Sequence, residues 1–558
     1  MRKLTFLLPI AILATSLVQQ VTAQGSVAPH LEKRGAITQL IVDGKPFVML
    51  SGELSNSTSS NLEYIKPIWS KLAAAGLNTV VTPLSWELVE PTEGKYDFTL
   101  VDGLLAQARA EHLRVVFLWL ASWKNGMSSY PPVWVKQDTK RFPRMMLNGV
   151  KVGVLSPQAA ATRDADARAF AALMAHIKAV DSTEHTVLMM QVENEVGLLG
   201  GSRDHSPEAD KAFASAVPAE LPQFLKAHRA NLDPELLTLW EQNGEKMSGT
   251  WSEVFGQGVR ADEIFMAWHY ARYVHSVAAQ GKAVYDIPMF VNCWLGGDGV
   301  KPGDYPSGGP QPRVVDVWRA AAPANGPGID IYAPDLYHPD FVGWSNRYHR
   351  DGNPLFMPET NGGATGAANV FYAVGEHAAI CFSPFAIERT LTVDFLKPDS
   401  AAGNTVFGIH IPSPDLSASY RTIAQVWPQL AEAQAKGNAH GFLLDKAHPS
   451  VDFPINGYIA HVSLDGVFGY TADKGFGLIY ATGPAEFMGA GSGFKVSFSL
   501  PNGGSTQVGI GTVDEGKFVD GQWVAGRRLN GDENDQGNSW RVDQFATQIE
   551  KATVYKFE

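Results

Sequence analysis

Cysteine is almost absent from this chain. The 558 residues include only Cys293 and Cys381. Two cysteines cannot supply the four ligands of a structural zinc site. Both fall within or beside predicted strands that are far apart in sequence. We therefore expect two buried free thiols rather than a disulfide, although an exported protein can form one.

Positive charge is also scarce. Lys and Arg total 45 against 57 Asp and Glu, so the formal net charge is −12. Nucleic-acid binding relies on Lys and Arg to neutralise phosphates, and so does attraction to an anionic membrane surface. We therefore expect neither nucleic acid nor an anionic membrane surface as a partner.

Long apolar runs are missing, apart from one near the N-terminus. There, Arg2 and Lys3 precede the apolar segment 4–18, and small residues lead to Ala23. A charged start, a short apolar region and a small residue at a cleavage point are typical of a signal peptide. The run is too short to span a membrane comfortably. We predict a signal peptide over 1–23 and an exported protein without a membrane anchor, either periplasmic or secreted.

Several catalytic motifs are absent from the sequence. It contains no His-Glu-x-x-His, no P-loop and no Gly-x-Ser-x-Gly. The glycine cluster 489–493 precedes a predicted strand, whereas a dinucleotide site requires the N-terminus of a helix. These absences argue against metalloprotease, nucleotide-binding and serine-hydrolase chemistry.

What the sequence does contain is a regular succession of apolar segments, in a chain too long for one hydrophobic core. Eight predicted strands mostly alternate with helical patterns, as in a (β/α)8 TIM barrel, an α/β fold. The strands end near residues 53, 82, 120, 194, 292, 332 and 359, and the eighth ends at Glu388. After residue 441, short alternating runs separated by Gly, Asn and Asp predict an all-β sandwich. We expect a barrel over 24–440 and a sandwich over 441–558.

Two of these strands deliver carboxylates to the end of the barrel where active sites form. The apolar run 186–190 leads into 191–197, which holds Glu193, Asn194 and Glu195. The run beginning at Pro354 leads to Glu359. A carboxylic acid and a carboxylate on opposite sides of a sugar are what glycosidic bond cleavage needs. Structural ion pairs are the alternative for any single Glu, but paired strand ends favour catalysis.

The two carboxylates have distinct predicted roles. We assign Glu195 as the acid/base and Glu359 as the nucleophile, because strands four and seven face each other across a barrel mouth. Carboxyl groups about 5–5.5 Å apart indicate retention of anomeric configuration, and about 6.5–9.5 Å indicates inversion.

Other polar and aromatic residues at strand ends are candidates for sugar binding. Asn194 is placed to bind a sugar hydroxyl. Glu53 and Asn292 end strands one and five, with an ion pair and a turn or cap side chain as their respective alternatives. Flat aromatic rings suit pyranose faces, and the candidates are Trp123, Trp294 and Trp344. Of these we favour Trp123, because it follows the end of strand three.

Several motifs together resemble the β-galactosidases of glycoside hydrolase family 35. These are 43–53, 77–98 and 191–197, with a looser match at Met357-Pro358-Glu359. The resemblance implies a retaining (β/α)8 enzyme that removes terminal β-galactose and needs no cofactor, and we predict no metal site. It also places the acid/base at Glu195, the nucleophile at Glu359, and at Tyr337 a tyrosine that hydrogen-bonds the nucleophile.

The chain departs from that family at two places. Where the family has Cys-Ala-Glu-Trp, this chain has Leu120-Ala121-Ser122-Trp123, so Ser122 replaces a galactose-binding Glu. The aromatic motif that follows the family's nucleophile is replaced by 360–363. A barrel with one β-domain is similar to a compact bacterial branch that includes enzymes trimming galactose from xyloglucan side chains.

The sequence therefore favours an exo-acting, retaining β-galactosidase for plant cell-wall oligosaccharides. The alternatives are a β-glycosidase for glucosides, mannosides or arabinopyranosides, or a carbohydrate-binding barrel without turnover. The expected partner is an oligosaccharide, and the oligomeric state is left open.

Overall fold

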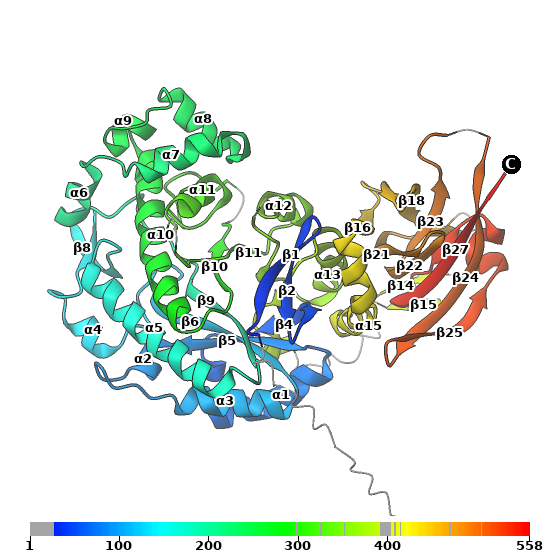
Figure 1. Ribbon diagram of the computed structural model, residues 1–558, viewed down its shortest axis with the longest axis horizontal. Coiled ribbons are helices and arrows are strands. Elements are labelled where there is room, and N and C mark those ends of the chain that lie inside the picture. The colour runs from blue at the N-terminus through cyan, green and yellow to red at the C-terminus, as the bar shows by residue number, and fades with distance from the viewer. Residues whose placement is uncertain are drawn as a thin grey trace, which may run out of the picture.

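A computed structural model describes residues 27–296, 299–323, 326–350, 352–390, 403–406, 409–412, 415–467, 470–503 and 505–558. A barrel and a separate β-structure lie side by side along the longest axis (Figure 1). The signal peptide predicted over 1–23 lies outside the described residues. No helix among those residues has the length and apolar character needed to cross a membrane.

The first part is a closed barrel of eight parallel strands, and it confirms the predicted TIM-barrel fold. Each strand pairs in parallel with both neighbours. The strands are β4 (Met49–Glu53), β5 (Thr79–Ser85), β6 (Arg114–Lys124), β9 (Val187–Asn194), β10 (Met289–Trp294), β11 (Ile331–Leu336), β12 (Met357–Thr360) and β13 (Cys381–Pro384).

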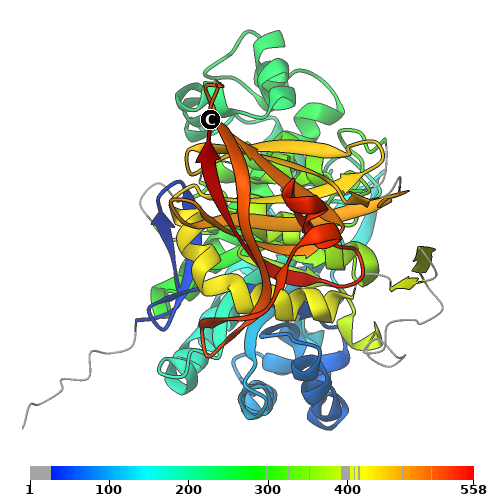
Figure 2. The same ribbon diagram turned by 90° about the vertical axis from the view of Figure 1, so that its right-hand side faces the viewer.

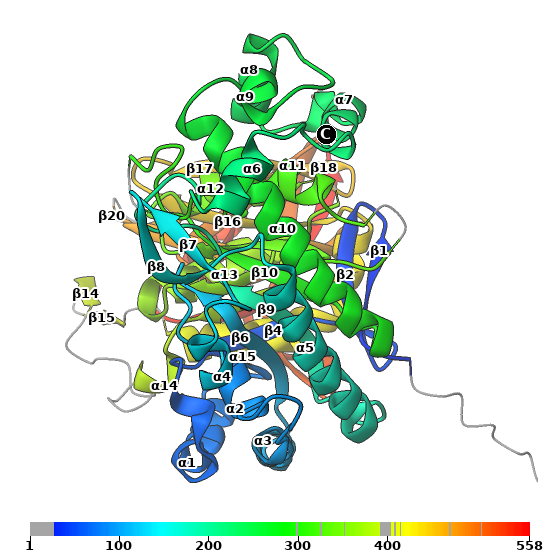
Figure 3. The same ribbon diagram turned by 90° about the vertical axis from the view of Figure 1, so that its left-hand side faces the viewer.

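Helices alternate with these strands along the chain. Their apolar faces contribute to one continuous core with the outward-facing strand residues. The helices are α1 (Leu62–Ala74), α2 (Trp86–Val89), α3 (Thr99–Ala110), α4 (Val133–Gln137), α5 (Ala160–Asp181), α10 (Val259–Val284), α11 (Pro312–Ala320), α12 (Phe341–Tyr348), α13 (Gly363–His377), α14 (Ile387–Thr390) and α15 (Leu416–Ala435). The long helices α5 and α10 run side by side along the face seen in Figure 3.

The long segment between β9 and β10 contains an insertion of short helices. These helices are α6 (Pro207–Phe213), α7 (Glu220–Ala227), α8 (Pro234–Gln242) and α9 (Trp251–Phe255), with the 3-10 turn η2 (Arg229–Asn231). Helices α7, α8 and α9 form a group at the top of Figure 1. Helix α9 begins with a capping box, in which Thr250 and Glu253 each bind the other's backbone N–H.

Smaller strand groups surround the barrel. A turn at Asp43-Gly44 joins β2 to β3 in a three-stranded sheet that precedes β4 in the chain. The remaining short elements are β1 (His30–Arg34), β2 (Ile37–Val42), β3 (Lys45–Phe47), β7 (Arg144–Leu147), β8 (Val150–Leu155), β14 (Gly403–Val406), β15 (Ile409–Pro412), β19 (Gly466–Val467), β20 (Tyr470–Thr471), and the 3-10 turns η1 (Thr58–Ser60) and η3 (Gly531–Gly537).

The C-terminal part is an antiparallel β-sandwich, which faces the viewer in Figure 2. A six-stranded sheet, β16-β21-β22-β27-β24-β25, packs on a four-stranded sheet, β17-β18-β23-β26, around an aromatic-rich core. The strands are β16 (Ala439–Asp445), β17 (Ser450–Ile455), β18 (Tyr458–Leu464), β21 (Lys474–Gly483), β22 (Glu486–Ser492), β23 (Phe494–Ser499), β24 (Gln507–Val519), β25 (Gln522–Leu529), β26 (Trp540–Val542) and β27 (Gln548–Phe557).

Helices α13 and α15 join the sandwich to the barrel. Their residues share one core cluster with side chains from β21 and β22, on the face of the six-stranded sheet that does not line the sandwich interior. At Gly375 the helix approaches β16 so closely that a Cβ there would lie 2.8 Å from the Cα of Gly441. Both glycines are therefore required by the contact between helix and strand.

Two sequence expectations are settled by the elements themselves. Cys293 and Cys381 are both buried and free, as predicted. Strand eight was predicted to end at Glu388, which is wrong, because β13 ends at Pro384 and Glu388 lies in α14. Its carboxylate accepts hydrogen bonds from the Ser55 N–H and the Thr58 hydroxyl, so it serves a loop after β4.

Candidate active site

Strand alternation directs polar side chains toward the barrel axis at the carboxyl ends of the strands. Ile331 and Ala333 lie in the apolar interior of the barrel. Side chains two residues apart share one face of a strand, so Asp335 points the same way at the end of β11. The same alternation carries β4 from Met49 to Glu53. A polar layer therefore caps the apolar interior of the barrel.

The acid/base candidate follows a strained strand end. Glu193 has φ +63° and Glu195 has φ +43°, a left-handed conformation that is costly for residues other than glycine. Such strain persists only where surrounding contacts enforce it. The Glu193 carboxylate accepts hydrogen bonds from the N–H groups of Ser122 (3.1 Å) and Trp123 (2.8 Å). The N–H of Glu195 donates to the Asn292 side-chain oxygen at 2.8 Å.

The nucleophile candidate, Glu359, is surrounded by hydrogen-bond donors. The Tyr337 hydroxyl donates to its Oε2 at 2.9 Å. The side-chain amides of Asn194 and Asn292 both donate to its Oε1 at 3.4 Å. Donors arranged in this way stabilise negative charge on a carboxylate. The predicted partnership of Tyr337 with Glu359 is therefore present in the structure.

Two contacts orient the asparagine amides. The Lys124 ammonium donates to Oδ1 of Asn194 at 2.7 Å, which leaves the NH₂ of Asn194 facing Glu359. The oxygen of Asn292 accepts the N–H of Glu195, which turns its NH₂ toward Asp335 (2.8 Å) and Glu359. Asn194 and Asn292 are almost completely buried. In this structure they therefore act on Glu359 and Asp335 rather than on an open cleft.

Three carboxyl groups meet at the centre of the mouth. One oxygen each from Glu195, Asp335 and Glu359 lie within 4.8 Å of one another. Burial and the nearby Glu359 raise the pKa of Glu195 to about 7, with Lys124 opposing the shift. A buried carboxyl with a raised pKa beside a second one that receives several donors is the pattern of an acid paired with a nucleophile.

The same three oxygens would be hard ligands for a divalent cation. Their neighbours are hydrogen-bond donors, however: Asn292 and Tyr337 point N–H and O–H groups at the cluster, and the Lys124 ammonium lies beside it. Donors and a fixed positive charge disfavour a cation. The surroundings therefore suit carboxyl groups that share protons better than they suit a metal.

Trp123 is not a sugar platform, and that prediction is wrong. Its ring is fully buried, its Nε1 donates to the Leu155 carbonyl at 3.0 Å, and its faces meet Tyr270 and Tyr273 edge-on. The pairing of β6 with β9 shifts register between Trp119 and Lys124. Such an irregularity re-aims side chains, and here it turns Trp123 away from the mouth.

The other two tryptophans are half-buried. Trp294 ends β10 with its ring centroid 6.1 Å from that of Tyr337, the tyrosine that binds the nucleophile candidate Glu359. Trp344 packs beside His338 and under the guanidinium of Arg347.

Glu53 does not reach the surface. Both carboxylate oxygens are enclosed by protein, and neither has a hydrogen-bond partner among the described residues. Burial, and then the charge of Glu359, hold the pKa of Glu53 well above its usual range. The predicted contact of Glu53 with a sugar is therefore contradicted in this conformation. Glu53 is instead a buried acid within reach of the charges of Glu359 and Lys124.

The departure at Ser122 also lies away from the mouth. Ser122 is buried, and its hydroxyl contacts a carboxylate oxygen of Asp166 (2.8 Å) and the hydroxyl of Tyr273 (2.7 Å). Asp166 belongs to α5 and Tyr273 to α10. This position therefore contributes to a polar network behind β6 rather than to sugar contact.

Sequence reasoning missed four residues of the site. Lys124 and Asn125 follow the predicted end of strand three, and the Asn125 side chain contacts the Glu195 carboxylate. Asp335 stands two residues before Tyr337, so its position at a strand end was a usable signal. Tyr305 donates its hydroxyl to the Glu195 carbonyl at 3.1 Å from a loop that carries no recognisable motif.

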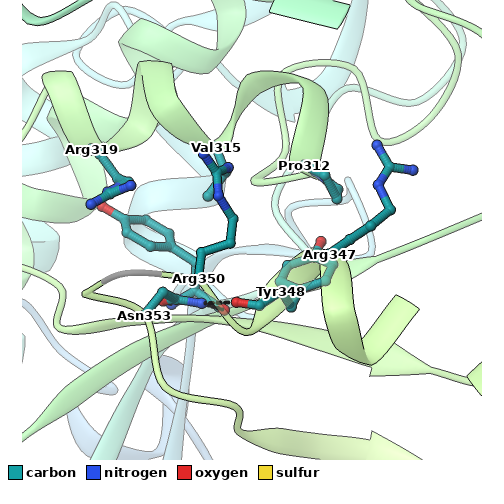
Figure 4. A pocket seen from close by; sticks show the side chains of 8 residues that line it. Pro312, Val315, Arg319, Arg347, Tyr348, Arg350 and Asn353 are labelled. Carbon is teal, nitrogen blue, oxygen red and sulfur yellow. Dashed lines mark hydrogen bonds between the residues drawn. The ribbon is translucent and has the colours of Figure 1, made fainter. Parts of the chain in front are cut away.

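A separate pocket between α11 and α12 contains none of these residues (Figure 4). Three arginines line it, but Arg350 pairs with Asp316 at 3.1 Å and Arg347 with Asp233 at 3.4 Å. The Asn353 amide bridges to the Tyr348 carbonyl at 2.8 Å. These contacts stabilise the loop before β12, and we assign the pocket no chemistry.

Comparison with known families matches two parts of the chain. A glycoside hydrolase family 42 model, described as β-galactosidase, matches residues 57–256. A domain of unknown function, DUF5597, matches residues 416–541, from α15 through most of the sandwich. The first match includes Glu195 but ends well before Glu359.

Two curated relatives are both described as β-galactosidases. The one from Xanthomonas manihotis is 29% identical over 184 residues, which cover 31% of this chain and 27% of the relative. β-Galactosidase 14 of Arabidopsis thaliana is 29% identical over 134 residues, covering 20% and 15% respectively. The chain therefore spans about a quarter or less of the length of these relatives.

Solved structures with a related barrel are more distant in sequence. A β-galactosidase from Halorubrum lacusprofundi has 14% identity and a TM-score of 0.43, covering 67% of this chain and 58% of its own. The catalytic domain of a β-amylase from Paenibacillus polymyxa has 13% identity and a TM-score of 0.42, covering 60% and 91%. At these values the likeness does not bear on the activity of this chain.

Proposed function

We propose that this protein is a glycoside hydrolase, and specifically a retaining, exo-acting β-galactosidase. The observation that carries the proposal is the pairing of Glu195 with Glu359 across the barrel mouth. One oxygen from each carboxyl lies within 4.8 Å of the other, which favours the shorter separation of retaining enzymes over the longer one of inverting enzymes. The environments of the two groups differ in the way that an acid and a nucleophile require.

The reaction would use the two carboxyls in turn. Protonated Glu195 gives its proton to the glycosidic oxygen while Glu359 attacks the anomeric carbon and the aglycone leaves. Glu195, now a carboxylate, takes a proton from water as that water attacks the same carbon and releases Glu359. Tyr337, Asn194 and Asn292 hold Glu359 in place for the attack.

Galactose is proposed as the sugar because the motifs and the curated relatives agree on it. The motifs at 43–53, 77–98 and 191–197 resemble family 35 β-galactosidases, and both curated relatives carry the name β-galactosidase. We further propose plant cell-wall oligosaccharides, including galactosylated xyloglucan side chains, as natural substrates, and export of the protein by its N-terminal apolar segment.

The test is hydrolysis of aryl β-glycosides by the purified protein. The panel contains the galactoside, glucoside, mannoside and arabinopyranoside, each with wild type, Glu359→Ala and the exposed control Glu208→Ala. We expect galactoside turnover that Glu359→Ala reduces by at least about 10⁴-fold and Glu208→Ala leaves unchanged. Proton NMR should show β-galactose as the first product.

Other results would redirect the proposal. If only another glycoside is hydrolysed, the catalytic roles of Glu195 and Glu359 stand, and that sugar replaces galactose as the proposed substrate. Release of the α-anomer first would refute retention. No turnover of any aryl glycoside or galactosylated oligosaccharide, with sugar binding intact, would favour the carbohydrate-binding barrel.

A further inference from the structure

The mouth of the barrel holds more carboxyl groups than the proposed reaction uses. Glu195 and Glu359 perform the two chemical roles, yet Asp335 lies within 4.8 Å of both. Asp335 is 1% exposed and ends β11 beside Glu359, its register partner on β12. A third carboxyl between the two reacting ones requires an explanation.

Charge balance limits how many of these groups are ionised together. Glu53, Glu195, Asp335 and Glu359 are all nearly or completely buried, and Lys124 is the cation beside them among the described residues. Like charges at this distance in a low-dielectric site cannot all persist. Some of the four carboxyls must therefore keep their protons at neutral pH.

The contacts indicate which oxygen of Asp335 carries the proton. Its Oδ2 accepts the Asn292 amide at 2.8 Å, whereas its Oδ1 is buried without such a donor among the described residues. Burial, and then the charges of Glu359 and Glu195, hold the pKa of Asp335 well above its usual range. A proton on Oδ1 would complete the hydrogen bonding of Asp335 by donating toward the neighbouring carboxyls.

We propose that Asp335 is a positioning residue for the acid/base: it stays a neutral carboxylic acid and donates a hydrogen bond to Glu195 whenever Glu195 is ionised. This inference rests on the proposed function, since it assigns Asp335 a role in the same site. In the reaction, Glu195 loses its proton to the leaving group and regains one from water. Asp335 keeps its own proton throughout, and it stabilises the Glu195 carboxylate that exists between these two proton transfers.

Several ionisable groups face Asp335 from the surrounding elements. They are Glu195 (just after β9), Glu359 (β12), Glu53 (β4), Tyr305 (the loop before α11), Tyr337 (just after β11) and Tyr348 (α12). The tyrosines stay neutral, because burial raises the pKa of each above its usual range. Glu195 and Glu359 are therefore the neighbours whose charge changes during the cycle, Glu195 by proton transfer and Glu359 by forming the glycosyl ester.

The test compares pH profiles of kcat/KM for wild type, Asp335→Asn and Asp335→Ala on phenyl β-galactoside, whose leaving group needs a proton from the acid. Asparagine replaces a neutral acid with a neutral donor of the same shape. For Asp335→Asn we expect the basic limb, the fall of kcat/KM at high pH, to stay within about 0.3 pH units of wild type, with less than about a tenfold loss of rate. Alanine removes the donor, so ionised Glu195 is less stable, and its basic limb should rise by about one unit.

The control variant lies at the opposite end of the same strand. Asp330→Asn disturbs a partly buried ion pair with Lys282 just before β11, and it should change stability but not the pH profile. The inference is wrong if Asp335→Asn lowers the basic limb by about one unit, because that result means an ionised Asp335. It is also wrong if neither variant moves the limb.

An infrared measurement tests the same point without catalysis. In protein labelled with ¹³C-aspartate at pH 7, Asp335→Asn should remove a C=O band of a protonated carboxyl that Asp330→Asn retains. Absence of that band in wild type overturns the inference even if the protein hydrolyses galactosides. If the band is present but no glycoside is cleaved, the proposed function fails while the neutral acid remains.

Discussion

At the residue scale, one buried lysine orients an amide that contacts the nucleophile candidate. Lys124 donates to Oδ1 of Asn194, and this contact leaves the Asn194 amide free to face Glu359. We expect Lys124→Ala to release that amide and lower kcat/KM by about 10- to 100-fold, because misplaced groups near a nucleophile are costly. Initial rates on an aryl galactoside measure the effect. Lys136→Ala, which removes a partly exposed ion pair with Glu87, should leave the rate unchanged. Equal effects of the two substitutions would refute this role.

Protonation of Glu195 sets the pH range of the proposed reaction. Its pKa is raised to about 7, so the protonated form needed for acid catalysis is lost as the pH rises through that value. We expect kcat/KM for an oligosaccharide, whose leaving group needs a proton, to fall about tenfold per pH unit above 7. A dinitrophenyl galactoside, whose leaving group needs none, should lack this decline in its glycosylation step. The same decline on both substrates would indicate that another group titrates.

At the element scale, the strained end of β9 depends on a second pair of acids. Glu193 and Asp166 are both fully buried and hydrogen-bonded to each other, and burial raises the pKa of both. Together they bind the backbone of Ser122 and Trp123 and the side chain of Ser122. This network fixes the bulged end of β6 beside the strand that leads to Glu195.

We expect Glu193→Gln to destabilise the fold and slow the reaction. The amide has one acceptor for two backbone N–H groups, so one buried donor is left unpaired at a cost of about 1–3 kcal/mol. Urea unfolding measures that cost, and kcat reports any displacement of Glu195. Glu184→Gln, in the exposed loop before β9, is the matched control. Unchanged stability of Glu193→Gln would mean that the strained backbone does not need this acceptor.

These elements also show what the sequence can predict. The apolar runs before Glu195 and Glu359 are long enough to specify strands, and their order specifies the barrel. The irregular end of β6 contacts α5 and α10, and no local sequence pattern reveals these contacts, so the buried position of Trp123 could not be predicted. Glu53 was placed at the correct strand end, but its depth depends on the neighbouring strands and on Glu359. The role of Lys124 was missed because a lysine after a strand is ordinarily exposed.

At the scale of the whole molecule, the barrel and the sandwich are held together through α13 and α15. The described interface is apolar and continuous with the barrel core, so the two parts should unfold together. Gly375 lies at a close approach in this interface, since a Cβ there would lie 2.8 Å from both the Gly441 Cα and the Leu478 Cβ. An added methyl group cannot be absorbed by a flexible side chain, because two of the nearest atoms are backbone.

We therefore expect Gly375→Ala to destabilise the protein by about 1–3 kcal/mol, as overpacking does, although alanine favours helix at exposed sites. Thermal unfolding followed by circular dichroism and by tryptophan fluorescence measures the change and shows whether both parts respond together. Gly153→Ala is the control, because a Cβ at Gly153 in β8 meets no atom within 4 Å. A loss of stability that leaves galactoside turnover intact at low temperature would place the effect at the interface. Unchanged unfolding of Gly375→Ala would mean that α13 can move away from β16, and that the sandwich does not hold the barrel rigidly.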